Sequence, residues 1–83
     1  MAEREHRAQR PHRAAVRVLG EGTVATVDLR EGITMRELLN EAGTTPRETG
    51  WDLFLDGRPA RLDTPVDHTR AATLAYVPRT RGG

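Results

Sequence analysis

Hydrophobic and polar residues alternate in two neighbouring stretches of the first third of the chain. The first stretch places Val16 and Val18 on one face, and the second places Val27 and Leu29 on one face. A period of two is typical of β-strands that bury one side. A short loop with two glycines, residues 20–22, joins the two stretches, so the pattern predicts a β-hairpin.

The next segment has the pattern of a short amphipathic helix. Thr34 and Glu37 have the spacing of a capping box, in which each side chain accepts a hydrogen bond from the other residue's amide. Apolar residues recur on one helical face at Met35, Leu38, Leu39 and Ala42. Gly43 is a typical residue after a helix end, so we predict a helix over about residues 35–42.

The second half of the chain predicts three further strands. Residues 51–55 form an alternating run that ends in the turn dipeptide Asp56-Gly57. A short strand can follow between residues 58 and 62, but only at a sheet edge, because Pro59 has no amide hydrogen to donate. Residues 72–77 alternate once more and are ended by Pro78.

The element order is therefore hairpin, helix, strand, short strand and strand. This order predicts an α+β fold in which one main helix packs on one face of a sheet. The inward positions of the helix and strands define a predicted core: Val16, Val18, Val27, Leu29, Leu38, Leu39, Leu53, Leu55, Leu74 and Tyr76.

A chain of 83 residues allows one domain, which we expect over residues 14–78. Residues 1–13 have no aliphatic side chain larger than alanine after Met1 and mix both charges. They are therefore expected to form a disordered N-terminal tail. Residues 79–83 follow the last strand and are expected to form a flexible C-terminal tail.

Composition narrows the classes of function. The net charge of +1 gives no electrostatic case for binding nucleic acid, and no apolar run is long enough to span a membrane. Cysteine is absent, which fits a cytoplasmic protein and removes thiol chemistry. A chain this short builds one small core, so a carrier or binding module is favoured over an enzyme. We expect no catalytic residues, no metal site and no bound cofactor.

Three stretches carry a family resemblance that covers residues 14–83. REGITMRELLNEAG is similar to the strand end, loop and helix of the ubiquitin-like β-grasp superfamily, which includes ubiquitin and the bacterial sulfur carriers of thiamine, molybdopterin and thiolated-tRNA synthesis. LFLDGRPA resembles a strand, turn and strand of the sulfur carriers, and TLAYVPRTRGG resembles the end of ubiquitin. The resemblance implies a β-grasp mixed sheet whose first and last strands are neighbours and parallel.

The resemblance also implies a role for the diglycine Gly82-Gly83. In the family, a ubiquitin-activating-type adenylating enzyme uses ATP to activate the terminal carboxylate. Glycine has no Cβ, so two glycines can lie extended in a narrow channel. Arg79 and Arg81 are then the candidate residues for recognition of the tail.

The sequence leaves three functions open. Gly83 can become a thiocarboxylate that delivers sulfur to an acceptor enzyme, which is the function we expect. It can instead be joined to target lysines, as in a protein modifier, or the domain can act as a non-covalent adaptor. Arg58, Arg61 and Arg70 are candidates for a basic surface near the tail, with plain solvation of these charges as the alternative.

The chain departs from both branches of the family. Pro78 and Thr80 stand where ubiquitin has leucines, and sulfur carriers usually have a small or apolar tail before the diglycine. The chain has 13 arginines and no lysine. A GC-rich genome explains this composition, and a surface without competing amines is the alternative explanation.

Overall fold

The structure is a computed structural model that describes residues 11–79 of the chain. The predictions made for residues 1–10 and 80–83 lie outside the described residues. The elements within the described range are β1 (Arg13–Val18), β2 (Thr23–Asp28), α2 (Met35–Glu41), β3 (Trp51–Leu55), β4 (Arg58–Ala60) and β5 (Ala72–Pro78).

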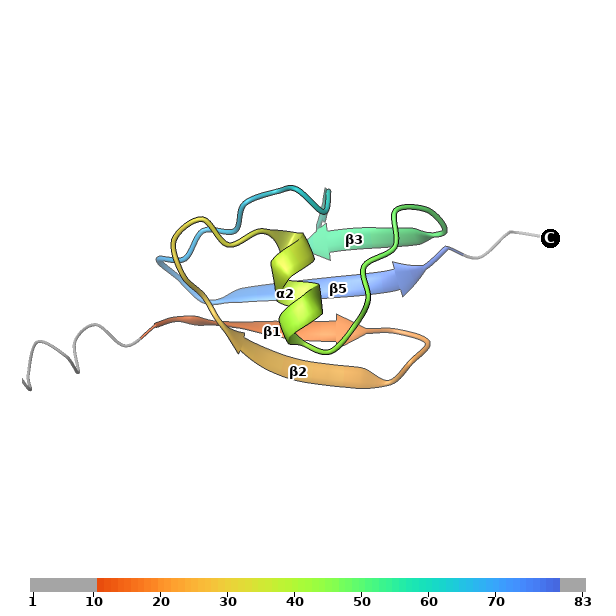
Figure 1. The fold of residues 1–83 in the computed structure, drawn as a ribbon, viewed down its shortest axis with the longest axis horizontal. Coiled ribbons are helices and arrows are strands. Elements are labelled where there is room, and N and C mark those ends of the chain that lie inside the picture. Colours follow the sequence, from red (N-terminus) through yellow and green to blue (C-terminus); the bar gives the residue numbers. More distant parts are fainter. Residues whose placement is uncertain (1–10, 80–83) are drawn as a thin grey trace, which may run out of the picture.

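The five strands form one mixed sheet in the order β2-β1-β5-β3-β4, and α2 crosses one face of it (Figure 1). β1 pairs with β2 in the antiparallel sense and with β5 in the parallel sense, so that Val16 lies opposite Leu74. β3 is antiparallel to both β5 and β4. The predicted α+β class is confirmed, and so is the expected parallel pairing of the first and last strands.

β4 is an edge strand, as the position of Pro59 required. Only three residues of β4 pair with β3, and Pro59 lies opposite Phe54. The turn before β4 has positive φ at both Asp56 (51°) and Gly57 (84°). Two residues with positive φ are characteristic of the tight turns that match the twist of a hairpin.

The helix begins and ends where its local signals predict. The amide of Glu37 donates to Oγ1 of Thr34 at 3.3 Å, and the amide of Thr34 donates to Oε1 of Glu37 at 2.9 Å. Ala42 is the C-cap, and Gly43 follows with φ of +90°. Seven residues form the helix, so the predicted range of 35–42 is one residue too long.

The core lies between α2 and the face of the sheet that α2 covers. Every predicted core residue is buried except Leu55, which is half-buried because it lies beside the exposed turn that leads to β4. The core also contains five residues that the prediction lacked: Ala14, Ile33, Met35, Val66 and Ala72.

The sheet extends slightly beyond the expected start of the domain at residue 14. β1 begins at Arg13, whose Nε lies 3.2 Å from Oδ1 of Asp28 on the neighbouring strand. The carbonyl of His12 accepts a hydrogen bond of 2.8 Å from the amide of Leu29. Residues 12 and 13 are therefore part of the paired backbone rather than of the expected tail.

Within residues 11–79, no helix is long and apolar enough to cross a membrane.

Replacing Leu38 by alanine should destabilise the domain by about 2–5 kcal/mol, because the side chain is fully buried between helix and sheet. Urea unfolding followed by the fluorescence of Trp51 measures the loss. Leu19→Ala is the matched control, since Leu19 is 47% exposed. It should cost no more than about 1 kcal/mol. Equal losses in the two variants would contradict the packing described.

Candidate functional site

The candidate site is the end of the sheet at which β5 finishes and the chain leaves the domain. We call it the exit region and define it as residues 50–52 and 76–79. The amide of Arg79 donates to the carbonyl of Gly50 at 2.8 Å, which continues the pairing of β3 and β5 by one residue. The Arg79 guanidinium donates to Oδ1 of Asp52 through Nε at 3.2 Å and through Nη2 at 2.9 Å. Arg79 is therefore bound to β3 by its backbone and its side chain.

Strand register explains why Asp52 and Arg79 meet. Asp52 lies opposite Val77 in the antiparallel ladder, and Arg79 is two residues beyond Val77. Residues two apart share a face, so Arg79 is the diagonal neighbour of Asp52, within reach of a long side chain. This face is the one that α2 leaves uncovered, because Leu53 and Tyr76 point into the core on the other side.

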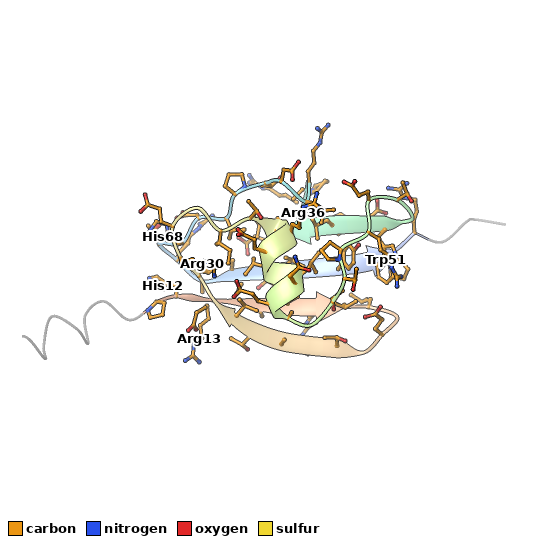
Figure 2. All side chains as sticks on the ribbon, in the orientation of Figure 1. His12, Arg13, Arg30, Arg36, Trp51 and His68 are labelled. Atoms are coloured by element: carbon orange, nitrogen blue, oxygen red, sulfur yellow. The ribbon has the colours of Figure 1, made fainter. Side chains whose placement is uncertain are left out.

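The opposite face of the exit region is aromatic. The rings of Trp51 and Tyr76 stack with centroids 4.6 Å apart and an angle of 19° between their planes. Figure 2 shows Trp51 at the end of the sheet where β5 finishes. The alternation of the third strand favours Trp51 as a core residue, and it is half-buried and packs against the core.

The hydroxyl of Tyr76 attaches the loop 42–50 to β5. It accepts a hydrogen bond of 2.6 Å from the amide of Arg47 and donates one of 3.0 Å to the Arg47 carbonyl. The Arg47 guanidinium carbon lies 5.4 Å from the centroid of the Trp51 ring, a cation–π distance. The loop therefore packs over the aromatic side of the exit region.

The β1–β2 loop contacts the exit region from a third direction. Gly20 has φ of +90°, and a Cβ built on it would lie 3.2 Å from Cγ of Pro78. Such a separation is closer than most side chains tolerate, so the backbone of the loop lies directly against the proline ring. Glycine is favoured at position 20 both by the positive φ and by this close approach, since a side chain would be strained there.

A groove with a volume of about 600 Å³ opens beside the exit region. Its charged and aromatic lining includes Arg36, Arg47, Trp51, Asp52, Arg61 and Arg79. Arg36 forms ion pairs with Glu48 at 3.5 Å and with Asp63 at 3.4 Å, so carboxylates balance part of the positive charge. The groove offers guanidinium groups and aromatic rings to a partner, and it shares Trp51, Asp52, Tyr76 and Arg79 with the exit region.

Of the residues predicted for recognition of the tail (Arg79 and Arg81) and for its activation (Gly82 and Gly83), the structure describes only Arg79. Arg79 lies in the exit region, whereas Arg81, Gly82 and Gly83 are outside the described residues. Arg61 lines the same groove as Arg79.

The expected basic surface near the tail is wrong for two of its three members. Arg58 and Arg70 line a separate cavity. Arg58 of β4 pairs with Leu55 of β3, and Leu55 pairs with Leu74, near the start of β5. Arg70 lies two residues before Ala72, the first residue of β5. Both arginines are therefore near the beginning of β5 rather than its end.

Sequence reasoning missed the part played by Asp52 and by the Tyr76 hydroxyl. In the sequence, Asp52 is one of several aspartates without the spacing of a metal site, and Tyr76 is a core residue. The outward position of Asp52 in its strand was readable from the alternation. Its pairing with Arg79 depends on the register between two strands that are distant in the chain, and local patterns carry no such register.

Polar contacts shift pKa values at the opposite end of the sheet, near the start of β5. Hydrogen bonds from the hydroxyl and amide of Thr69 lower the pKa of the Asp67 carboxyl. A hydrogen bond with Glu41 raises the pKa of the Arg30 guanidinium. In the part of the chain that the structure describes, no group of three or more histidine or acidic side chains is arranged to hold a metal ion.

Comparison with known proteins does not assign the chain to a family. No protein-family model matches it, and no curated protein sequence matches it. Arguments about function therefore rest on the residues and the geometry.

Replacing Tyr76 by phenylalanine should destabilise the domain by about 1–2 kcal/mol, because the Arg47 amide loses a partly buried partner. Urea unfolding measures the loss, and faster exchange of the Arg47 amide hydrogen should accompany it. Thr26→Val removes a hydroxyl from an exposed position of β2 and should change stability by less than about 0.5 kcal/mol. An unchanged exchange rate at Arg47 would contradict the role given to the hydroxyl.

Replacing Gly20 by alanine should destabilise the domain and also displace the exit region. Positive φ costs a residue with a Cβ about 1 kcal/mol or more, and the new methyl group meets Pro78. Gly22→Ala is the control, because Gly22 also has positive φ (+73°) but has nothing within 4 Å of its Cβ position. The NMR chemical shift of the Arg79 amide should change in Gly20→Ala and stay the same in Gly22→Ala. Equal shifts would show that the loop does not contact the strand end.

Proposed function

We propose that this protein is a ubiquitin-like β-grasp carrier whose Gly83 carboxylate is activated by an adenylating enzyme, and that the activated group becomes a thiocarboxylate that carries sulfur. The observation that supports this most strongly is the parallel pairing of β1 with β5 at the centre of the sheet, with α2 over one face. The sequence resemblance implies the same arrangement. The proposal requires Gly83 to carry the terminal carboxylate in the mature protein.

The exit region suits a domain that presents its own chain end. β5 finishes at Pro78, and Arg79 is bound to the sheet directly after it. Four residues lead from Arg79 to Gly83, and four residues span at most about 14 Å. Gly83 thus stays close to the domain, which a partner enzyme can grip while the carboxylate reacts in the enzyme's own site.

The proposed chemistry needs little from the domain itself. A carboxylate is a poor acyl donor, so the Gly83 oxygen first displaces pyrophosphate from ATP and forms an acyl-adenylate in the partner enzyme. Hydrosulfide then attacks the acyl carbon, forms the carbon–sulfur bond and displaces AMP, which leaves the thiocarboxylate. The two glycines let the chain lie extended close to the nucleotide, and an error of about 1 Å in such a geometry can cost a hundredfold in rate.

A protein modifier is the second candidate, because an adenylated Gly83 can also be attacked by a lysine of a target protein. The absence of lysine from this chain bears on both candidates. Arginine stays protonated and does not compete as a nucleophile, so one copy of the protein offers no lysine to the activated Gly83 of another. The chain can therefore carry an activated carboxylate without lysine-linked self-modification.

The intact mass of the protein purified from its own host distinguishes the candidates. A carrier should show the replacement of one oxygen by sulfur at Gly83, and a modifier should appear as a conjugate with a larger protein. A mass that corresponds to a chain end other than Gly83 would overturn both.

Deleting Gly83 should abolish the ATP-dependent change in mass when the protein is incubated in an extract of its host. Gly82→Ala should reduce it strongly, because the methyl group hinders the extended chain. The melting temperature should be the same in both variants, since the core is built from residues between Ala14 and Tyr76. Glu21→Ala, in an exposed loop, is the control and should react as the wild type does. Equal reaction with and without Gly83 would leave the non-covalent adaptor as the better hypothesis.

A further inference from the structure

We propose that Asp52 is a positioning residue for the activation of Gly83. The inference rests on the proposed function and extends it to a residue of β3. By binding Arg79, Asp52 sets the point and the direction from which the last four residues leave the domain. When a partner enzyme binds the domain, the segment that leads to Gly83 then begins at a fixed position relative to the enzyme.

The contacts at the strand end give Asp52 this role. Pro78 has no amide hydrogen, so β5 donates no ladder hydrogen bond from that position. Beyond Pro78, a single backbone hydrogen bond joins Arg79 to Gly50, and the Arg79 side chain is bound to Asp52 beside it. The guanidinium also approaches the Trp51 carbonyl at 3.5 Å. Asp52 supplies the only carboxylate that pairs with Arg79 within residues 11–79.

The number of residues between Gly83 and the last contact with the sheet is the quantity that Asp52 controls. We call these residues the tether. While Arg79 is bound, four residues connect the sheet to Gly83. If its side chain is released, the remaining hydrogen bond to Gly50 frays more readily, and the tether effectively begins at Pro78 or earlier. A longer tether spreads the carboxylate over a larger volume and lowers its effective concentration at a fixed reaction centre.

The expected effect is moderate because the ion pair is exposed. The side chains of Arg79 and Asp52 are 61% and 44% exposed. Exposed pairs shift an equilibrium by no more than severalfold. Asp52→Asn keeps the shape of the side chain and removes its charge. A tether longer by one or two residues lowers the effective concentration by about 1.4- to 1.8-fold. We therefore expect kcat/KM for the activation of Gly83 to fall by about 1.5- to twofold.

A competition in one tube measures this ratio directly. Isotope-labelled wild-type protein and an equal amount of unlabelled Asp52→Asn are incubated with ATP in an extract of the host. Mass spectrometry then compares the modified fraction of each protein. Because both share the same enzymes, the ratio of early product equals the ratio of their kcat/KM values. The melting temperatures of the two proteins should agree closely, since the pair is exposed.

Two variants and one change of conditions separate positioning from a general effect of charge. Asp52→Glu keeps the carboxylate and should recover most of the wild-type rate. Asp28→Asn breaks a similar exposed pair with Arg13, and Figure 2 shows Arg13 at the end of the sheet opposite Trp51. The Asp28→Asn variant should be modified as fast as the wild type. Raising the salt from about 0.05 M to about 0.5 M should bring the ratio for Asp52→Asn towards one, because salt screens exposed charges.

The outcomes distinguish this inference from the proposed function. If the wild-type protein itself is not modified, the proposed function fails and the role of Asp52 falls with it. If the wild type is modified and Asp52→Asn is modified at the same rate at low salt, the positioning role alone is overturned. A faster reaction of Asp52→Asn would also overturn it, because Asp52 would then mask Arg79 from the partner rather than position it.

Discussion

The parallel pairing of β1 with β5 is the interaction on which the rest of the structure depends. It joins the first and last strands of the domain at the centre of the sheet, from Ala14 opposite Ala72 to Val18 opposite Tyr76. Residues on one side of both strands are buried against α2, so this pairing creates the floor of the core. β2 and β3 then add to the outer edges of the central pair. Because β5 lies between β1 and β3, it has a paired strand on each side.

The helix depends on the rest of the chain for its stability. Seven residues are too few for a helix that is stable in isolation. The capping box satisfies some of the free amides of its first turn, and carbonyls of a distant loop satisfy others. The amides of Met35 and Arg36 donate to the carbonyls of Thr64 and Leu62 at 3.0 and 2.9 Å. This loop thereby fixes the start of α2 over the sheet, while Leu38 and Leu39 fix its buried side.

The exit region uses both faces of the sheet at once. On the covered face, the stacked rings and the Tyr76 hydroxyl attach the loop 42–50 to the end of β5. On the uncovered face, the Arg79–Asp52 pair extends the contact of β5 with β3 by one residue. The two sets of contacts hold the end of β5 to β3 and to the loop 42–50. A well-held strand end suits the proposed carrier function, in which a partner enzyme would bind the domain and act on Gly83.

The sequence by itself determined the elements of this protein, because their signals lie within a few residues of one another. Alternation defined the strands, the Thr34–Glu37 capping box defined the start of the helix, and Pro59 confined β4 to an edge. The inward positions of these elements predicted most of the core. The tertiary structure alone decided the register between β3 and β5, and with it the meeting of Asp52 with Arg79 and of Tyr76 with the backbone of Arg47. Register is set by the simultaneous burial of side chains from strands that are distant in the chain, and no local pattern contains that information.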